Sequence, residues 1–206
     1  MVALIDYGIG NIRSVEKALR HLGAPVRITR DPDEIRRADR IVFPGVGAFG
    51  DGMEAVRRLG LEAPLREAID AGTPFLGICL GMQLLFQVSE EMGEHQGLGI
   101  FPGRVVRFPD GMGLKVPQIG WNQLHRQRPH PLLEGVPDGA YVYFVHSYYC
   151  RPADPSLVLA TTDYGLEYAS VVGRGHVFGL QFHPEKSQAV GLRILRNFLT
   201  LPKDPL

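Results

Sequence analysis

Residues 73–89, TPFLGICLGMQLLFQVS, constrain the fold more than any other stretch of the chain. The residues before Cys79 are typical of a short buried strand, and Leu80 to Val88 carries apolar residues four apart, as on one face of a helix. Cys79 alone separates the two, with Gly77 and Gly81 on either side. Because glycine has no Cβ, the pair permits a sharp strand-to-helix turn that lifts the thiol clear of a sheet.

The pattern G-x-C-x-G is that of a nucleophile elbow with sulfur in place of a hydroxyl. At the start of a helix, the dipole and the free N–H groups favour a thiolate at Cys79. The N–H of Leu80 would also point toward a reacting carbonyl, as half of an oxyanion hole. A lone cysteine in an apolar run is more often a small core residue, so the interpretation needs a base elsewhere in the chain.

A base is predicted in residues 177–186, VFGLQFHPEK, which read as a buried strand ending in His183-Pro184-Glu185. Pro184 disfavours a helical conformation for His183, so this stretch is expected to be extended. In an extended chain, His183 and Glu185 share a face. His183 could then take the thiol proton while Glu185 holds the imidazole in the correct tautomer.

The order of elements predicts the fold class. The first half alternates strands and helices, which indicates a doubly wound, mostly parallel α/β sheet. The second half is rich in strands, which we expect to add antiparallel pairs to the sheet before a closing helix over 187–199. The predicted strands are 2–6, 26–29, 40–43 and 73–78 in the first half, and 104–108, 115–118, 140–150, 157–162, 167–172 and 177–183 in the second. A length of 206 residues suggests a single domain over 1–206.

Composition excludes several classes of function. The 22 basic and 22 acidic residues balance, so no basic stripe for nucleic acid is expected. Only five apolar residues precede Asp6, which is too few for a signal peptide or a membrane span, so we expect a cytoplasmic protein. The two cysteines, Cys79 and Cys150, form no metal-binding pair or disulfide framework, and Cys150 is expected to be buried and inert.

The segment GVGAFG at 45–50 matches the glycine pattern of a dinucleotide site. It follows the third predicted strand, and the next strand ends without the acidic residue that such a site requires. We therefore expect no nucleotide, and neither a cofactor nor a metal.

Several motifs together resemble the class I glutamine amidotransferases over the whole chain: GICLGMQ, FHPEKS, FPGVGAF, GWN and YFVHSYY. Within that family, DYGIGNIRS, GWN, FVHSYY and HPEKS look most like the glutaminase subunits of imidazole glycerol phosphate synthases. The resemblance implies a Cys-His-Glu triad of Cys79, His183 and Glu185. It implies that the N–H of Val46 completes the oxyanion hole begun by Leu80. Glutamine would be held by Gly47, Gln83, Ser147 and Tyr148.

The resemblance also implies a partner. This chain has no evident acceptor site for the ammonia released from glutamine, so it looks like half of an enzyme. A (β/α)₈-barrel cyclase would form a heterodimer with it and use the ammonia in histidine biosynthesis. The loop from Gly8 to Asn11, together with Trp121 and Lys186, would lie at the interface.

Three alternatives stay open on the sequence. The chain could be the glutaminase subunit of another class I amidotransferase, such as that of anthranilate or pyridoxal phosphate synthesis, although Met82 and Lys186 are unfavourable to this reading. It could be a free-standing thiol hydrolase. It could also be a binding module without catalysis, which a complete triad disfavours.

Overall fold

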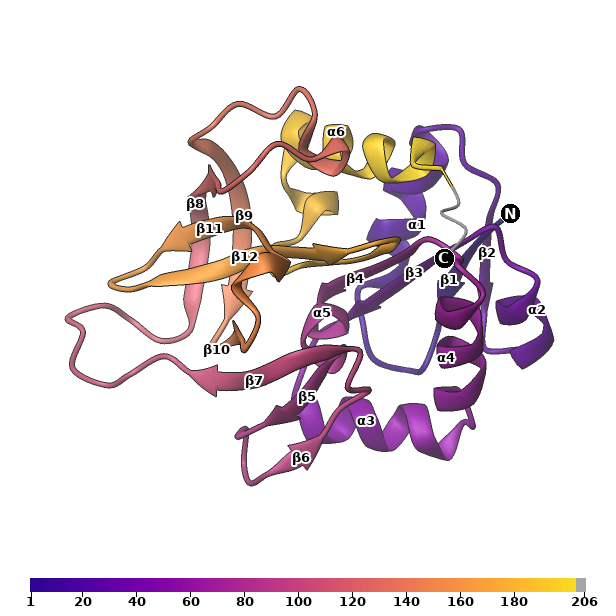
Figure 1. Cartoon of the computed structure of the whole chain (residues 1–206), viewed down its shortest axis with the longest axis horizontal. Coiled ribbons are helices and arrows are strands. Elements are labelled where there is room, and N and C mark those ends of the chain that lie inside the picture. The colour runs from indigo at the N-terminus through magenta and orange to yellow at the C-terminus, as the bar shows by residue number, and fades with distance from the viewer. Residues whose placement is uncertain (203–206) are drawn as a thin grey trace.

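The computed structural model describes residues 1–202, which build one 13-stranded mixed sheet. Ten strands follow the order β2-β1-β3-β4-β13-β12-β10-β7-β5-β6, and β11, β8 and β9 continue from β12 as a separate branch. This branch forms the arm at the left of Figure 1. The sheet therefore has a parallel part and an antiparallel part that meet near its centre.

The parallel part forms as the sequence predicts. β1 lies between β2 and β3, β3 pairs with β4, and all of these pairs are parallel. The strands are β1 (Val2–Ile5), β2 (Val26–Thr29), β3 (Arg40–Gly45) and β4 (Phe75–Cys79). The helices between and after them are α1 (Ile12–His21), α2 (Pro32–Arg36), α3 (Phe49–Arg58), α4 (Glu62–Asp70) and α5 (Leu80–Leu84). Asp31 caps α2 by accepting a hydrogen bond from the N–H of Asp33 at 2.8 Å.

The second half contributes mainly antiparallel strands, as predicted. They are β7 (Phe101–Arg107), β8 (Gln118–Arg126), β9 (Ala140–His146), β10 (Tyr148–Pro152), β11 (Val158–Asp163), β12 (Glu167–Arg174) and β13 (Val177–Leu180). β13 joins the two parts, because it pairs with β4 in parallel and with β12 in antiparallel orientation. Three short 3₁₀ turns, η1 (Pro131–Leu133), η2 (Pro155–Leu157) and η3 (Pro184–Lys186), and the last helix, α6 (Gln188–Thr200), complete this half.

Several predicted elements are wrong in extent. The strand expected over 140–150 is two strands, β9 and β10, which pair with different neighbours. The helix expected to reach Val88 ends at Leu84, and β5 (Phe86–Ser89) follows it, paired with β7 and with β6 (His95–Gln96). The four-residue apolar spacing does not distinguish a helix from two buried elements, and the aromatic and β-branched side chains of β5 suit a strand. The strand expected at 115–118 instead begins at Gln118 and continues to Arg126.

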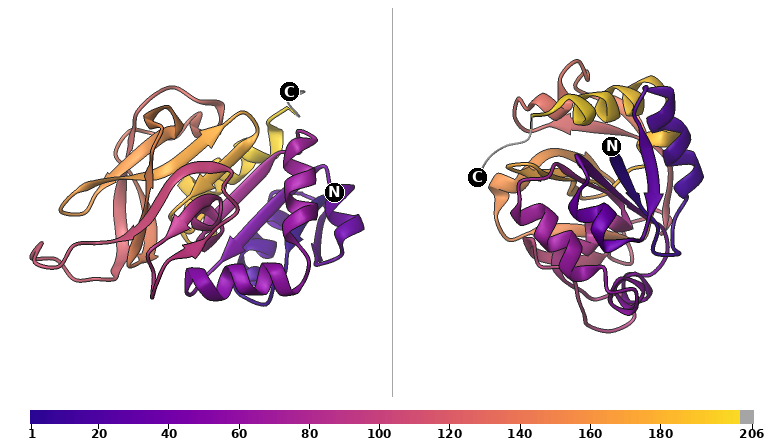
Figure 2. Two further views of the ribbon diagram at one scale, coloured as in Figure 1. Left: turned by 60° about the horizontal axis from the view of Figure 1, so that its bottom comes forward. Right: turned by 90° about the vertical axis from the view of Figure 1, so that its right-hand side faces the viewer.

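Helices cover both faces of the sheet, and the sheet separates two apolar cores. α1 and α6 lie over one face, and α3, α4 and α5 lie over the other (Figures 1 and 2). The first core gathers around Leu4, Leu76 and Phe144, and the second around Ile5, Phe43 and Phe75. The strands between them read as apolar runs because they are buried on both sides.

None of the helices within residues 1–202 has the length and the apolar character that a membrane crossing requires.

Candidate active site

Cys79 lies at the sharp junction of β4 and α5. Its φ is 55° and its ψ is −112°, which is a strained conformation for a residue with a side chain. The flanking glycines make the turn possible: a Cβ on Gly81 would lie 1.7 Å from the carbonyl oxygen of Phe43. A Cβ on Gly77 would lie 2.6 Å from the carbonyl oxygen of Gly81. The structure therefore contains the elbow that the G-x-C-x-G pattern predicts.

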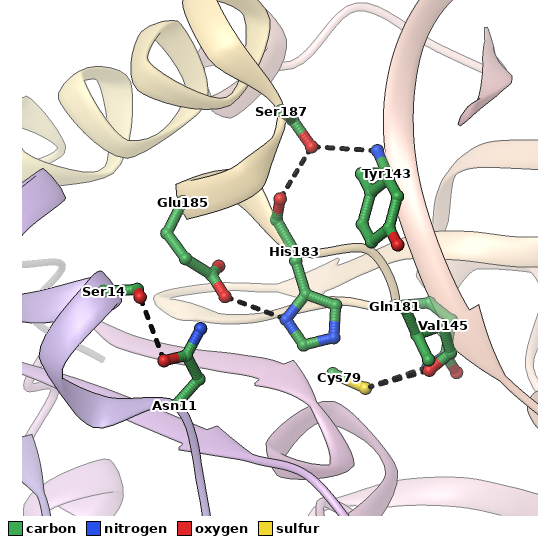
Figure 3. A network of polar contacts seen from close by, with 9 residues as sticks. All are labelled: Asn11, Ser14, Cys79, Tyr143, Val145, Gln181, His183, Glu185 and Ser187. Carbon is green, nitrogen blue, oxygen red and sulfur yellow. Dashed lines mark hydrogen bonds and ion pairs between the residues drawn. The ribbon is translucent and has the colours of Figure 1, made fainter. Parts of the chain in front are cut away.

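The base candidates lie beside this elbow. His183 Nδ1 is 2.9 Å from Glu185 Oε1, and both side chains are almost fully buried. The other ring nitrogen of His183 faces Cys79 (Figure 3). The predicted reason for this pairing is wrong in part: His183 is extended, but Glu185 belongs to the 3₁₀ turn η3, and that turn brings the carboxylate back to the ring.

The electrostatics of the three side chains favour an imidazolium. Burial lowers the pKa of His183, but hydrogen bonding and charge attraction to Cys79 and Glu185 outweigh it and raise the pKa to about 10. An imidazolium beside sulfur stabilises a thiolate, which is the nucleophilic form of cysteine.

The loop that carries His183 is fixed from two sides. The Ser187 hydroxyl donates to the His183 carbonyl at 2.6 Å and accepts from the N–H of Tyr143 at 3.0 Å (Figure 3). α6 packs closely on the same loop, since a Cβ on Gly191 would lie 1.9 Å from the carbonyl oxygen of Pro184. β9 and α6, which are distant from each other in sequence, therefore hold the histidine in place.

A cavity of about 330 Å³ opens in front of Cys79 and His183. Most of the predicted site residues line it: Val46, Gly47, Cys79, Leu80, Gln83, Ser147, Tyr148, His183 and Lys186. Glu185 lies behind His183, while Asn11 and Trp121 lie outside the lining. Asn11 directly precedes α1 as its N-cap residue and accepts a hydrogen bond from the Ser14 hydroxyl at 2.9 Å. Trp121 is 47% exposed on β8.

Gln83 enters the cavity in a fixed orientation. Its Nε2 donates to the Tyr148 carbonyl at 3.0 Å and to Gln181 Oε1 at 3.2 Å. Both donors of this amide are thereby used within the protein. Its oxygen is left to accept a hydrogen bond from a ligand.

Sequence reasoning missed Gln181, although a signal for it existed. Gln181 follows β13 at the level of Cys79 on the neighbouring strand β4 and has no exposed surface. Its Nε2 lies 3.9 Å from Cys79 Sγ, and the thiol itself is 3.9 Å from the carbonyl of Val145. A glutamine two residues before His183, in an otherwise apolar strand, shares the face of the histidine.

Glu91 and His146 also line the cavity. The sequence patterns predicted no role for either residue. Glu91 accepts a hydrogen bond from the N–H of Phe49 at 2.8 Å, and burial raises its pKa. His146 Nδ1 donates to the Tyr148 carbonyl at 2.8 Å. Burial lowers the pKa of His146 to about 4, so this ring stays neutral beside the charged His183.

Comparison with known proteins agrees with this arrangement. Residues 3–201 match the family model described as "Glutamine amidotransferase class-I". The chain is 54% identical to the "Imidazole glycerol phosphate synthase subunit HisH" of Syntrophotalea carbinolica, with 96% of this chain and 98% of that protein covered. It is also 54% identical to the protein of the same description from Geobacillus kaustophilus, with 97% and 96% covered.

Solved structures share the fold at lower identity. One described as "Structure of PurLQS from Thermotoga maritima" superposes with a TM-score of 0.77 at 19% identity, covering 96% of each chain. Another, described as "Crystal structure of glutamine amidotransferase", gives a TM-score of 0.75 at 23% identity, covering 97% of each chain. At identities this low, the similarity is evidence for a shared fold only.

Proposed function

Because the chain belongs to the class I glutamine amidotransferase family, we propose that it is the glutaminase subunit of an imidazole glycerol phosphate synthase, an enzyme of histidine biosynthesis. One observation carries the chemistry: a cysteine at a strained strand-to-helix turn faces a buried histidine that is paired with a carboxylate. This is the arrangement that acyl transfer through a thioester requires.

The reaction follows from the three side chains. The Cys79 thiolate attacks the carbonyl carbon of the glutamine side-chain amide. The C–N bond then breaks, and ammonia leaves with a proton donated by the His183 imidazolium. His183 next takes a proton from water, which attacks the thioester and releases glutamate and the thiolate. Glu185 holds the ring in one orientation through both steps.

Two backbone N–H groups would stabilise the oxyanion, one from Leu80 at the start of α5 and one from Val46 after β3. Both residues line the cavity. We place the substrate ammonium against Gln83 Oε1 and the Glu91 carboxylate, and the substrate carboxylate toward the backbone of Gly47, Ser147 and Tyr148. The carboxylate of Glu91 is suited to this role because its charge is opposite to that of the ammonium.

We propose that the partner is a (β/α)₈-barrel cyclase that receives the ammonia. Support comes from an apolar surface on the β8–β9 pair. This β8–β9 patch consists of Ile119, Trp121 and Tyr141, which are 63%, 47% and 55% exposed. Trp121 stands opposite Tyr143 in the strand register, and Lys186 Nζ lies 5.8 Å from the centre of the Tyr143 ring, so the patch adjoins the mouth of the cavity. Exposed apolar surface of this kind marks an interaction site.

We also propose a cytoplasmic location, because the reaction needs Cys79 as a reduced thiol. Neither cysteine forms a disulfide within residues 1–202. A single domain over 1–206 remains our proposal, and the continuous sheet supports it.

The decisive experiment combines reconstitution with substitution of the nucleophile. We expect the wild-type chain, mixed with a barrel cyclase, to release glutamate from glutamine and to support cyclisation. Cys79→Ala should abolish both glutamine-dependent reactions, while added ammonium salt should still drive the cyclase. Cys150→Ala is the matched control, because this second thiol is buried on β10 and does not line the cavity.

The same assay separates the alternatives. Glutamate release by the Cys79→Ala complex would overturn the assignment of the nucleophile. Full activity without any partner would favour a free-standing hydrolase, and no glutamate release under any condition would favour a binding module.

A further inference from the structure

Tyr7 carries a buried hydroxyl that the reaction as described does not use. Its ring packs on Phe43, with centroids 5.0 Å apart, and the residue is 1% exposed. Within residues 1–202 the hydroxyl oxygen has no hydrogen-bond partner. A buried polar group without a partner costs free energy, so such a group requires an explanation.

The hydroxyl lies beside both segments that would supply the oxyanion hole. These two arms are the loop after β3, which carries Val46, and the start of α5 at Leu80. A Cβ on Gly45 would lie 2.1 Å from this oxygen and 3.0 Å from the Cβ of Leu80. The hydroxyl therefore touches the backbone of Gly45, the residue directly before Val46. Gly45 also pairs with Cys79 in the register of β3 and β4, so both arms meet at this point.

The peptide between Gly45 and Val46 turns about ψ of Gly45 and φ of Val46 with little movement of the Cα atoms, and Gly45 eases this rotation because it has no Cβ. The N–H and the C=O of one peptide point in opposite directions, so turning the Val46 N–H into the cavity moves the Gly45 carbonyl away from it. A carbonyl oxygen lies about 2.4 Å from its own Cα. A hydroxyl that touches the Gly45 Cα is therefore within reach of this oxygen for part of the rotation.

We propose that the Tyr7 hydroxyl is a positioning group that donates a hydrogen bond to the Gly45 carbonyl when the Val46 N–H faces the oxyanion, and thereby holds the oxyanion hole open. The proposal rests on the proposed glutaminase function and concerns the same site. Burial, together with the nearby charge of Cys79, raises the pKa of Tyr7, so the hydroxyl keeps the proton that it donates. In the present structure the hydroxyl has no partner, so this bond is not formed here.

Tyr7→Phe tests the proposal, because it removes only the hydroxyl and keeps the ring on Phe43. In the complex with the cyclase, we expect kcat for glutamine hydrolysis to fall about tenfold, with KM changed less than twofold, since one buried hydrogen bond is lost. Ammonium-dependent turnover should stay unchanged. Alkylation of Cys79 by iodoacetamide should also keep its rate, because this reaction needs a thiolate but no oxyanion hole.

Stability should move in the opposite direction to activity. In the free chain Tyr7→Phe removes an unpartnered buried hydroxyl, so we expect Tm to rise by about 2–4 °C. Tyr168→Phe is the matched control for the direction of the change in Tm. The Tyr168 hydroxyl donates to Gln118 Oε1 at 2.8 Å, so loss of this hydrogen bond should lower Tm.

Three results would overturn the proposal: an unchanged kcat, a lower kcat accompanied by a lower Tm, or a parallel loss of ammonium-dependent turnover. None of them would touch the proposed function, which wild-type activity and its loss in Cys79→Ala decide separately.

Discussion

Two buried histidines give the site opposite responses to pH. The pKa of His183 is raised to about 10 by its contacts with Cys79 and Glu185, against the burial that opposes them, and the pKa of His146 is lowered to about 4 mainly by burial. Both start from the ordinary value of about 6.5. One imidazole therefore works as an acid while its neighbour stays neutral and structural.

These shifts predict that stability declines on both sides of neutral pH. The folded chain holds the His183 proton more tightly than the unfolded chain, so its contribution is complete below about pH 6.5 and is lost as the pH rises toward 10. For His146 the folded pKa is the lower one, so its contribution is complete above about pH 6.5 and is lost as the pH falls toward 4.

Urea unfolding of the free chain across pH 4–10 measures both limits. We expect His183→Gln to reduce the fall in unfolding free energy above pH 6.5, which is the alkaline limb of the profile. His146→Gln should reduce the fall below pH 6.5, the acid limb. Each substitution should leave the other limb unchanged. An alkaline limb equally steep in His183→Gln and in the wild type would contradict this assignment.

The elbow depends on how closely α5 approaches β3. Because a Cβ on Gly81 would lie 1.7 Å from the Phe43 carbonyl, any side chain there must push the helix away from the strand. The chemistry of Cys79 thus rests on a backbone contact between two elements, and not on the side chain of Cys79 alone.

We predict that Gly81→Ala lowers the free energy of unfolding by more than about 3 kcal/mol and abolishes glutamine hydrolysis, because overpacking against backbone has no flexible atom to yield. Gly60→Ala is the matched control. Gly60 has a φ of +65°, and a Cβ added to it would have no atom within 4 Å. Gly60→Ala should therefore lower the free energy of unfolding only by the cost of a left-handed backbone conformation, about 1–2 kcal/mol. Similar losses from both substitutions would refute the close approach as the cause.

Sequence patterns predicted the elements that depend on local chemistry. The glycines around Cys79 indicate one local geometry, and the structure contains it. Elements that depend on distant partners were harder: β5 exists because it pairs with β6 and β7, and its apolar residues alone fitted a helix equally well. Gln181 could have been found from strand alternation, whereas Glu91 reaches the cavity only through its loop.

At the scale of the whole molecule, the site lies where the parallel and antiparallel parts of the sheet meet. Cys79 ends β4, and His183 follows β13, the next strand in the sheet. The antiparallel part also carries the β8–β9 patch, which adjoins the cavity through Tyr143 and Lys186. The catalytic residues and the proposed partner surface thus lie on different parts of the same sheet, and Tyr143 and Lys186 connect them at the cavity.

Trp121→Ala tests the β8–β9 patch as the partner surface. We expect the complex to weaken by about 2 kcal/mol, or about thirtyfold in Kd, since a large exposed aromatic residue is a typical interface anchor. The Tm of the free chain should stay within about 1 °C, because the side chain is half exposed.

Lys186→Ala provides a second measurement on the same surface. It should weaken the complex or uncouple glutamine hydrolysis from cyclase turnover, with the isolated fold intact. Met92→Ala is a control for exposed apolar surface elsewhere, as Met92 is 85% exposed in the loop between β5 and β6. Unchanged affinity in both Trp121→Ala and Lys186→Ala would exclude this surface.

The central position of β13 has a consequence for the order of synthesis. Among residues 1–202 this strand is the last in sequence, yet it fills the gap between β4 and β12, so a chain still emerging from the ribosome carries two unpaired strand edges where the sheet will close. The nucleophile is translated long before its base. A growing or prematurely terminated polypeptide therefore lacks His183 and cannot consume the cell's glutamine, and hydrolysis becomes possible only when the finished chain inserts its final strand.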